Sequence, residues 1–373
     1  MSEWRYIVQA LPSGEWLEWD LPLTNVEITQ ELSGPGGLSG SVPVEVARLK
    51  GADGSPLLTP WGCAIWAEAS GEIRGGGLLV RSEFNGASWS LECVGLSGYA
   101  NGQPWTAKEY KGIQVDPLSI VRRIWNHLQS QPGGNLGLVV DSTTSPVRIG
   151  TESEDVEFTT GAGQDVAFEA GPFKLNAWST ADVGKVVDDL AAATPFDYLT
   201  HTRWDGEQLA HRLELAYPRR GSRRTDMRFV VGENVTVEPA QVMDGDEYAT
   251  EVLALGAGEG SEMVRASVSA RRQGLRRALS VADKSARSKR AATDVARREL
   301  AWRSADVVVE ELRVRQSALA EVHAIRPGDE VFFQSDVGWL DVAMWVRVLA
   351  VSTFPEDLST VALRVARSET VVA

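Results

Sequence analysis

DKSARSKRAATDVARRELAWR, residues 283–303, together with the segment that follows it to Phe333, is the stretch from which the fold is best inferred. Small and apolar residues recur on one side at helical spacing, while Lys, Arg and one Asp occupy the other side, which predicts a basic amphipathic helix. Glu299 interrupts the apolar side, and Arg303 one turn later predicts an i,i+4 ion pair that accommodates it. The apolar side comprises Ala291, Ala292, Val295, Ala296, Leu300 and Trp302.

A strand, a turn and a second strand are predicted after this helix. The first strand is predicted at residues 307–315. RPGD at residues 326–329 is typical of a type II turn, because Pro presets the first central dihedral angle and Gly tolerates the positive φ of the second. VFF at residues 331–333 predicts a buried strand. Upstream of the helix, TEVLALG at residues 250–256 predicts a strand that ends in Gly.

This order of elements resembles the C-terminal half of bacteriophage tail hub proteins, the ring-forming baseplate proteins at the tip of long-tailed phages. Members of that group have a strand ending in Gly, a helix with Ala at helical spacing, and a Pro-Gly-Asp turn that opens a small barrel. The N-terminal half is similar to minor tail proteins of this kind from actinobacteriophages, so the resemblance covers most of the chain. An excess of Arg over Lys, 30 against 7, agrees with the high-GC coding of such a host.

The resemblance implies a mainly β, multidomain fold with an α+β insertion, in which tail-tube-like β domains precede a small C-terminal β-barrel. It implies a homotrimeric ring that closes the tail tube, adapts its symmetry, anchors tip proteins and forms a channel for DNA ejection. The implied partners are copies of the chain, the distal tail protein and tail tube, the tape-measure protein, and downstream minor tail proteins or adhesins. DNA would be bound only in passage, no stable membrane association is expected, and the location would be the virion tail tip, assembled in the host cytoplasm.

Changes of pattern along the chain predict four domains. Residues 1–105 are rich in hairpin signals and predict a tube-like β domain, and residues 106–232 add helices and predict an inserted α/β domain. Residues 233–314 predict a second tube-like β domain that contains the basic helix. Residues 315–373 predict the terminal barrel. Its strands are expected at residues 329–333, 341–351 and 358–365.

Three hairpins are predicted in the first two domains. An opening hairpin would turn at residues 12–14, and Asn85-Gly86 is a strong signal for a two-residue turn. The second hairpin would turn Cys93 inward, with the pairs Leu78–Cys93, Val80–Leu91 and Ser82–Trp89. A third hairpin, turning at Asp205-Gly206, would share one apolar face among Phe196, Tyr198, Leu209, Leu213 and Leu215.

Two helices are also predicted. Asp116 is a suitable N-cap and Pro117 suits the first helical position, and this helix should end at QPGG, residues 131–134. The second helix is expected at residues 180–193. The acidic run at residues 152–157 and the Gly-rich stretch at residues 33–41 are predicted to be loops. The Gly-rich stretch lacks the Lys and the following helix that a phosphate-binding loop needs.

The net charge of −14 argues against a nucleic-acid-binding protein, which would carry a basic surface. The charge is uneven, because residues 265–315 contain 14 basic and 6 acidic residues, a local +8, which leaves −22 for the rest of the chain. In a hub, a channel lined with carboxylates would repel DNA and let the genome slide without sticking. The alternative is that the acidic surplus only maintains solubility.

Cys63 and Cys93 fall in predicted strands without metal-ligand spacing, so buried, reduced thiols are expected. The N-terminus MSEWR has neither the basic head nor the apolar run of a signal peptide. No window approaches 18 consecutive apolar residues, so no membrane-spanning helix is expected.

The sequence contains no complete catalytic motif. Gly95-Leu96-Ser97-Gly98 has its second Gly one position too early for a hydrolase nucleophile elbow, and H-E-x-x-H is absent. GAGEG at residues 256–260 departs from dinucleotide-binding spacing and predicts a hairpin loop. His201 and His211 are the candidate metal or catalytic residues. The predicted register pairs them with Ala210 and Thr200, which places the imidazoles on opposite faces, where they cannot share one ion.

We therefore expect no enzyme, and no catalytic, cofactor-binding or metal site, although a glycosidase carboxylate pair is defined only in space. The alternative function is a tail-tip cell-wall hydrolase or carbohydrate-binding protein, which would expose Trp side chains to sugars. Trp89, Trp125 and Trp302 fall on predicted buried faces, whereas Trp105, Trp204 and Trp339 lie near turns. RRGSRR at residues 219–224 is either a solvated loop or a docking segment for an acidic neighbour.

Overall fold

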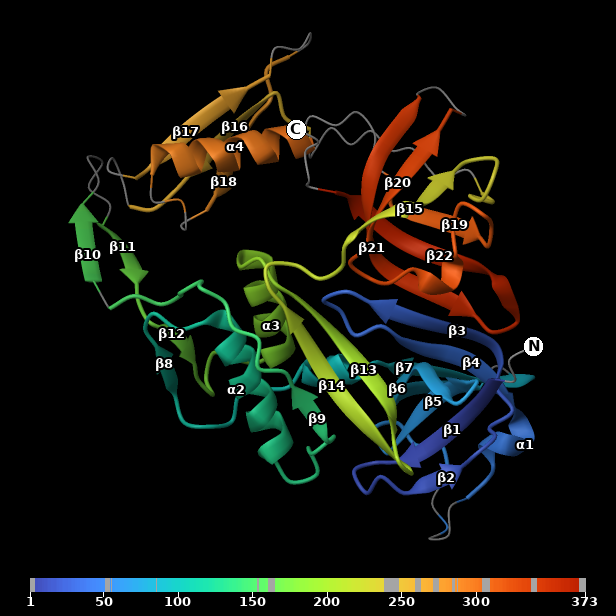
Figure 1. The fold of residues 1–373 in the computed structure, drawn as a ribbon. Helices are drawn as coiled ribbons and strands as arrows, with labels where there is room; N and C mark the ends of the chain where they lie inside the picture. The colour runs from blue at the N-terminus through green and yellow to red at the C-terminus, as the bar shows by residue number, and fades with distance from the viewer. Residues whose placement is uncertain are drawn as a thin grey trace. The chain divides into compact units, whose positions relative to one another are not determined.

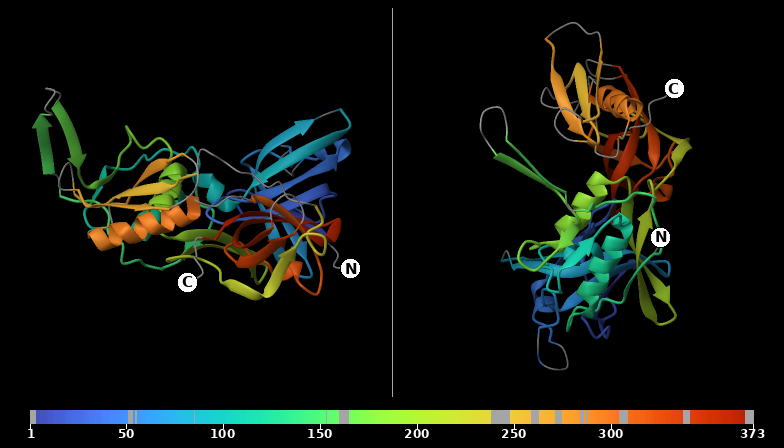
Figure 2. Two further views of the ribbon diagram at one scale, coloured as in Figure 1. Left: turned by 90° about the horizontal axis from the view of Figure 1, so that it is seen from above. Right: turned by 90° about the vertical axis from the view of Figure 1, so that its left-hand side faces the viewer.

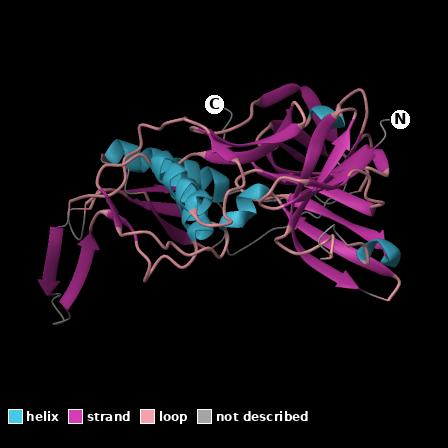
Figure 3. Cartoon of the chain, turned by 90° about the horizontal axis from the view of Figure 1, so that it is seen from below, coloured by secondary structure: helices cyan, strands magenta, loops and turns pink. Residues whose placement is uncertain are grey.

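The computed structural model describes residues 4–50, 54, 56–84, 86–152, 154–159, 165–237, 248–258, 263–270, 275–283, 286, 288–303, 309–336 and 341–368; for 154–159, 165–170, Ala47, Ala301 and Trp302 it describes the backbone alone. Strands dominate and helices are few (Figure 3), which confirms the mainly β fold predicted from the sequence. In the described part, no helix is long and apolar enough to cross a membrane.

The chain divides into two compact units, one of Met1–Gly221 with Ala350–Leu358 and one of Ser222–Leu349 with Ser359–Ala373. The division into four domains stays a prediction.

The first unit opens with an antiparallel sheet in the order β3-β4-β7-β6-β5-β1-β2. The end of β21 (Val342–Phe354) belongs to this unit, where Ala350–Thr353 pair with β3. β1 and β2 form the opening hairpin predicted to turn at residues 12–14. The bounds are β1 (Trp4–Ala10), β2 (Trp16–Glu18), β3 (Thr24–Glu31), β4 (Gly37–Pro43), α1 (Val44–Ala47), β5 (Cys63–Ala69), β6 (Glu72–Phe84) and β7 (Ser88–Val94).

The β6–β7 hairpin forms as predicted, but its register differs. The turn is longer than two residues, because Phe84 pairs with Trp89, and a β-bulge between Leu79 and Arg81 then brings Leu79 and not Leu78 opposite Cys93. Leu79 and Cys93 therefore share one core, and Cys93 is buried as predicted, whereas Leu78 belongs to a second core. The other predicted pairs are also wrong, because the observed ones are Ser82–Leu91 and Phe84–Trp89. Asn85 itself lies outside the described residues.

The Gly-rich stretch at residues 33–41 is only partly the loop that was predicted, since its second half belongs to β4. Glycine is needed because backbones approach closely. A Cβ on Gly37 would overlap the carbonyl oxygen of Cys93, and a Cβ on Gly77 would overlap that of Val94. The strands β4, β6 and β7 therefore pack backbone against backbone where a side chain would force them apart.

Among its described residues, the rest of the first unit adds two α-helices and three small sheets, β13-β14-β9, β12-β8 and β10-β11. The acidic run at residues 152–157 was wrongly predicted to be a loop, because most of it forms β10, whose backbone pairs with β11. Its acidic composition hid the alternation of polar and apolar residues that is typical of strands. The bounds are η1 (Leu96–Ala100), β8 (Tyr110–Gly112), α2 (Pro117–Ser130), β9 (Leu138–Val140), β10 (Glu154–Thr159), β11 (Asp165–Ala170), β12 (Phe173–Leu175), α3 (Val183–Ala193), β13 (Asp197–Asp205) and β14 (Gln208–Ala216).

The two helices begin at aspartate caps. The Asp116 carboxylate accepts the Leu118 N–H at 3.1 Å, as the prediction required. α3 begins at Val183, three residues later than predicted, because the Asp182 carboxylate accepts the Lys185 N–H at 3.0 Å and so acts as its N-cap.

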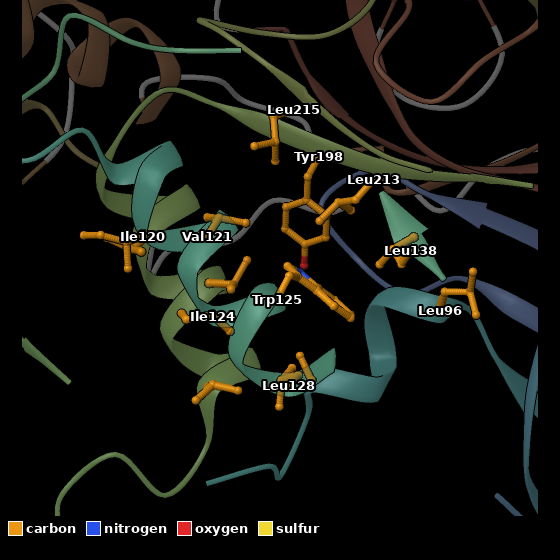
Figure 4. Close-up of a cluster of buried hydrophobic side chains, with 14 of the residues drawn as sticks. Leu96, Ile120, Val121, Ile124, Trp125, Leu128, Leu138, Tyr198, Leu213 and Leu215 are labelled. Atoms are coloured by element: carbon orange, nitrogen blue, oxygen red, sulfur yellow. The ribbon is translucent and has the colours of Figure 1, made fainter. Parts of the chain in front are cut away.

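α2 and α3 pack with β13 and β14 around a common hydrophobic core (Figure 4). Trp125 of α2 is 1 % exposed and lies beside Tyr198 and Leu213. Tyr198, Leu213 and Leu215 are all buried, which confirms the apolar face predicted for the third hairpin. Burying each such large side chain stabilises the fold by roughly 1.5–3 kcal/mol.

In the second unit, a sheet in the order β15-β20-β21-β22-β19 forms around the predicted Pro-Gly-Asp turn. The Asp329 N–H donates to the Arg326 carbonyl at 3.1 Å, and Gly328 has φ +99°, which confirms the turn. Val331 and Phe333 are buried, as predicted, while Phe332 between them is half-buried. The bounds are β15 (Arg223–Val230), β19 (Glu311–Arg315), η3 (Val322–Ala324), β20 (Glu330–Ser335) and β22 (Asp357–Arg367).

The strand β15 was not predicted to join this sheet, and it pairs parallel to β20. Asp329 holds it there. This carboxylate is 6 % exposed and accepts the Ser222 N–H at 3.3 Å and an Arg224 N–H at 3.3 Å. The turn residue therefore also anchors the strand that precedes it by about a hundred residues in the chain.

The basic helix also lies in the second unit, along one face of the sheet β17-β16-β18 (Figures 1 and 2). It begins at Lys289 and not at residue 283 as predicted, because the Ser288 hydroxyl accepts the Ala291 N–H at 3.2 Å. The predicted Glu299–Arg303 ion pair is confirmed, at 3.2 Å. The bounds are β16 (Glu251–Leu255), β17 (Arg265–Ser269), β18 (Ala278–Ala282) and α4 (Lys289–Arg303).

The first testable prediction concerns backbone packing at Gly77. Gly77→Ala should lower the free energy of unfolding by about 1–3 kcal/mol, because the new Cβ overlaps the Val94 carbonyl oxygen. Urea denaturation followed by tryptophan fluorescence would measure it. Gly171→Ala is the matched control, since nothing lies within 4 Å of a Cβ there, and it should change stability by less than about 1 kcal/mol. Equal effects of the two substitutions would contradict the packing argument.

Candidate assembly surface

Three tryptophans gather where two sheets of the first unit end. Trp16 lies in β2 and Trp204 in β13, and each of these strands is the last of its sheet among the described residues. Trp19 follows β2 directly. We call Trp16, Trp19 and Trp204 the tryptophan surface. It lies on edge strands, and the edges of sheets are natural sites for contact with another chain.

The rings of the tryptophan surface contact one another closely. The Trp16 ring centroid lies 4.9 Å from that of Trp19 and 5.4 Å from that of Trp204. The Trp19 and Trp204 rings are stacked, with centroids 6.3 Å apart and planes inclined by 11°. These contacts fix the rings before any partner arrives, so binding would cost little side-chain entropy.

An ion pair supports the tryptophan surface from one side. The Arg5 guanidinium lies 5.4 Å from the Trp19 ring centroid and 2.6 Å from the Glu68 carboxylate. A cation over an aromatic face is attracted by the ring electrons, and Glu68 holds that cation in place. Trp19 nevertheless remains 44 % exposed. A rigid, partly exposed aromatic group of this kind is typical of protein interfaces.

Only Trp204 of these three residues was a candidate from the sequence. The missed signal is WLEW at residues 16–19, in which two large aromatic residues flank a short polar strand. Trp105, the second candidate for sugar stacking, is 3 % exposed and donates its indole N–H to the Lys108 carbonyl at 3.1 Å, so it packs inside. Trp125 is buried as predicted, Trp89 is half-buried, and Trp339 and the Trp302 side chain lie outside the described part.

The two candidate histidines are not brought together. The observed register pairs His201 with Arg212 and Thr202 with His211, two positions from the predicted one, because the turn is centred on residues 206–207. The imidazoles still lie on opposite faces, as predicted. His211 is buried and stacks on Trp66 with ring centroids 5.1 Å apart, and the Thr202 hydroxyl bonds to its Nδ1 at 3.0 Å.

His201 lies on the outer face and forms part of a charged cluster. Its Nε2 is 2.7 Å from the Glu214 carboxylate, which also accepts from Arg220 at 3.3 Å. Burial works to raise the pKa of Glu214, but the hydrogen bonds and charges of His201 and Arg220 outweigh it and lower the pKa. A carboxylate held ionised by two partners is suited to an ion pair and not to proton transfer near neutral pH.

The remaining candidates for chemistry have packing roles. The Ser97 hydroxyl is buried and donates to the Gly34 carbonyl at 3.3 Å. Cys63 and Cys93 are free and buried, and burial raises the pKa of Cys63 to about 11 and that of Cys93 further, so neither is a thiolate at neutral pH. Among the described residues, no group of three or more His, Cys, Asp and Glu side chains could hold a metal ion.

Three arginines of the basic segment at residues 219–224, for which a solvated loop and a docking segment were the alternatives, form ion pairs. Arg220 pairs with Glu214, Arg223 pairs with Glu330 at 3.2 Å, and Arg224 pairs with Asp226 at 2.8 Å and with Asp329. These arginines are therefore engaged within their own units.

Comparison with solved structures shows which proteins share this architecture. The prophage MuSo2 43 kDa tail protein from Shewanella oneidensis superimposes with a TM-score of 0.56 at 12 % identity, covering 98 % of this chain and 99 % of that chain. A tail protein from Neisseria meningitidis MC58 gives 0.54 at 13 %, covering 98 % and 97 %. Prophage tail protein gp18 from Listeria monocytogenes EGD-e gives 0.57 at 10 %, covering 98 % and 95 %.

This chain has the fold of prophage tail proteins. The fold expected from the resemblance is thereby confirmed along almost the whole chain. The sequence matches no protein-family model and no curated protein.

The second testable prediction concerns the buried imidazole in the first unit. Burial lowers the pKa of His211 to about 4, below its ordinary value of 6.5. A lowered folded-state pKa means that the unfolded chain takes up the proton first, so stability should be full above about pH 6.5 and fall as the pH drops toward 4. The loss should approach about 3 kcal/mol.

Urea denaturation at several pH values would measure this loss. His211→Phe keeps a ring on Trp66 but cannot be protonated, so its free energy of unfolding should depend less on pH between 6.5 and 4 than that of the wild type. Parallel curves for the two proteins would contradict the assignment.

Proposed function

We propose that this chain is a structural hub of a phage tail tip, a ring-forming protein that closes the end of the tail tube. The observation that carries this proposal is the similarity of fold to three tail proteins, which extends over 98 % of this chain and at least 95 % of each of them. At 10–13 % identity the similarity concerns the fold, so the function assigned here is an inference from it.

Ring formation is supported by two edge strands of the first unit. β2 and β13 end their sheets within the described part, and the tryptophan surface lies on them. A closed ring of identical chains would cover such edges without leaving new ones. We infer that the tryptophan surface contacts the neighbouring subunit.

We base the symmetry of the ring on two tube-like domains in each chain. We assign the first to residues 1–105, which contain β1–β7, and the second to residues 233–314, which contain β16–β18 and α4. Three chains would then present six similar domains to a sixfold tail tube. The hub would thereby convert the sixfold symmetry of the tube to the threefold symmetry of the tip.

The remaining roles concern neighbours and DNA. Outside residues 265–315 the chain carries −22, and a channel lined by that surplus would repel the phosphate backbone and let DNA pass. The distal tail protein, the end of the tape-measure protein and the tip adhesins would be its protein neighbours. The residues that the sequence offered for chemistry make structural contacts: Ser97 donates to a carbonyl, His201 pairs with Glu214, and the two cysteines are buried and free.

The third testable prediction is the ring itself. Mass photometry of the purified full chain should show trimers in equilibrium with monomers, and electron microscopy should show a ring with a central opening. Antibody labelling of intact virions should place the chain at the tail tip. A chain that remains monomeric at all accessible concentrations and labels another part of the virion would exclude the proposal, and a lytic band in host-cell-wall zymography would favour the hydrolase instead.

The fourth testable prediction concerns the tryptophan surface. Trp19→Ala should raise the dissociation constant of the trimer by roughly thirtyfold, the effect of losing about 2 kcal/mol at a central interface residue. Trp178→Ala is the matched control, because Trp178 is 76 % exposed and belongs to the segment between β12 and α3, and it should leave the constant unchanged. Equal effects, or none, would place the subunit contact elsewhere.

A further inference from the structure

α4 carries exposed cations that its own contacts neutralise only in part. Arg290, Arg297 and Arg298 lie on its outer side, and Lys289 is exposed at its first residue. Asp294 neutralises one of them, since it pairs with Arg297 at 3.0 Å. The other three form no ion pair with any residue that the structure describes. We call Lys289, Arg290 and Arg298 the α4 cations.

The opposite side of α4 is fully used in packing. Ala292, Val295, Ala296 and Leu300 are buried against β16 and β17. The small alanines bring the helix axis close to the sheet, so the helix is held rigidly with its cations turned outward. The cations are therefore presented on a fixed support and not on a mobile loop, which reduces the entropy lost when they bind.

The charge of the rest of the chain indicates which kind of surface the α4 cations bind. The residues outside 265–315 carry a formal net charge of −22, so the rest of every copy, here called the acidic body, is acidic overall. In a ring each subunit would offer a basic helix to one neighbour and an acidic body to the other. Such a head-to-tail contact is heterologous, which is the type of contact that closes rings.

We propose that the α4 cations of one subunit dock on the acidic body of the next copy of the chain, and that this contact sets the orientation of neighbours in the ring. The inference rests on the proposed function, because it requires a ring. Exposed charge pairs contribute modestly one by one, but three on one helix act together and exclude wrong orientations by like-charge repulsion.

The test reverses these charges in the full chain. Lys289→Glu, Arg290→Glu and Arg298→Glu combined should weaken assembly at low salt by roughly tenfold or more in the dissociation constant. A control that reverses Arg48, Lys50 and Lys108, which are exposed cations in the first unit, changes the net charge equally and should leave assembly as in the wild type. A variant that keeps the charges, Lys289→Arg with Arg290→Lys and Arg298→Lys, should also assemble normally.

A mixing experiment separates lost docking from misfolding. The reversed chain keeps its acidic body, so it should still accept the α4 cations of wild-type chains, and labelled reversed chains should enter mixed assemblies with them. Raising the NaCl concentration should weaken wild-type assembly more than assembly of the reversed chain, because salt screens exposed charges.

Each outcome bears on one proposal. Rings of the reversed chain as stable as the wild type, or equal weakening by the control, would overturn the α4 contact and leave the hub function standing. If the wild type binds DNA and the α4 reversal abolishes this binding while the rings are unchanged, the cations bind nucleic acid. That result would also overturn the α4 contact. A wild-type chain that forms no ring at any salt concentration would overturn the hub function itself.

Discussion

The pairing of β13 with β14 is the constraint on which the first unit depends. Asp205 lies opposite Gln208, and from that point the side chains alternate between the two faces of the hairpin. One face contributes Tyr198 and Leu213 to the core shared with α2, stacks His211 on Trp66, and brings Trp204 to Trp16. A slip of one residue would turn all of these outward and place His201 and its charged neighbours in the core. The register of β13 and β14 therefore determines the hydrophobic core, the buried imidazole and the tryptophan surface together.

Charged side chains also fall into two groups: those paired within the chain, and those left to pair with a neighbouring chain. The arginines after β14 looked from sequence like a free basic segment, yet Glu214, Glu330 and Asp329 engage three of them. The pairs to Glu330 and Asp329 join segments more than a hundred residues apart in sequence, so they help to specify the fold. The cations of α4 show the contrary pattern, because only one of the exposed ones has a carboxylate partner among the described residues. Basic composition alone therefore does not identify a docking surface; the pairing of each cation decides it.

Much of the fold could be predicted because its signals are local. The Asp116 cap, the Pro-Gly-Asp turn and the Glu299–Arg303 pair each depend on residues within a few positions, and each was found. The errors arose where the local pattern leaves several pairings open. The β6–β7 turn is longer than two residues and a bulge follows it, which shifts the register, and the parallel addition of β15 depends on an aspartate about a hundred residues away. Of the candidate surface only Trp204 was anticipated, because the ring cluster forms between strands that no local pattern connects.

The tryptophan surface and the α4 cations differ in physical character. That difference suggests which step of assembly each would support. Contacts between aromatic rings draw on burial and dispersion, which salt hardly weakens, whereas contacts of exposed charges fade as the Debye length falls from about 30 Å at 0.01 M to about 3 Å at 1 M salt. Affinity would then come from Trp16, Trp19 and Trp204, and orientation and encounter rate from α4. A ring built in this way assembles in the correct order through its charges and stays closed through its aromatic contacts when the ionic strength around the particle changes.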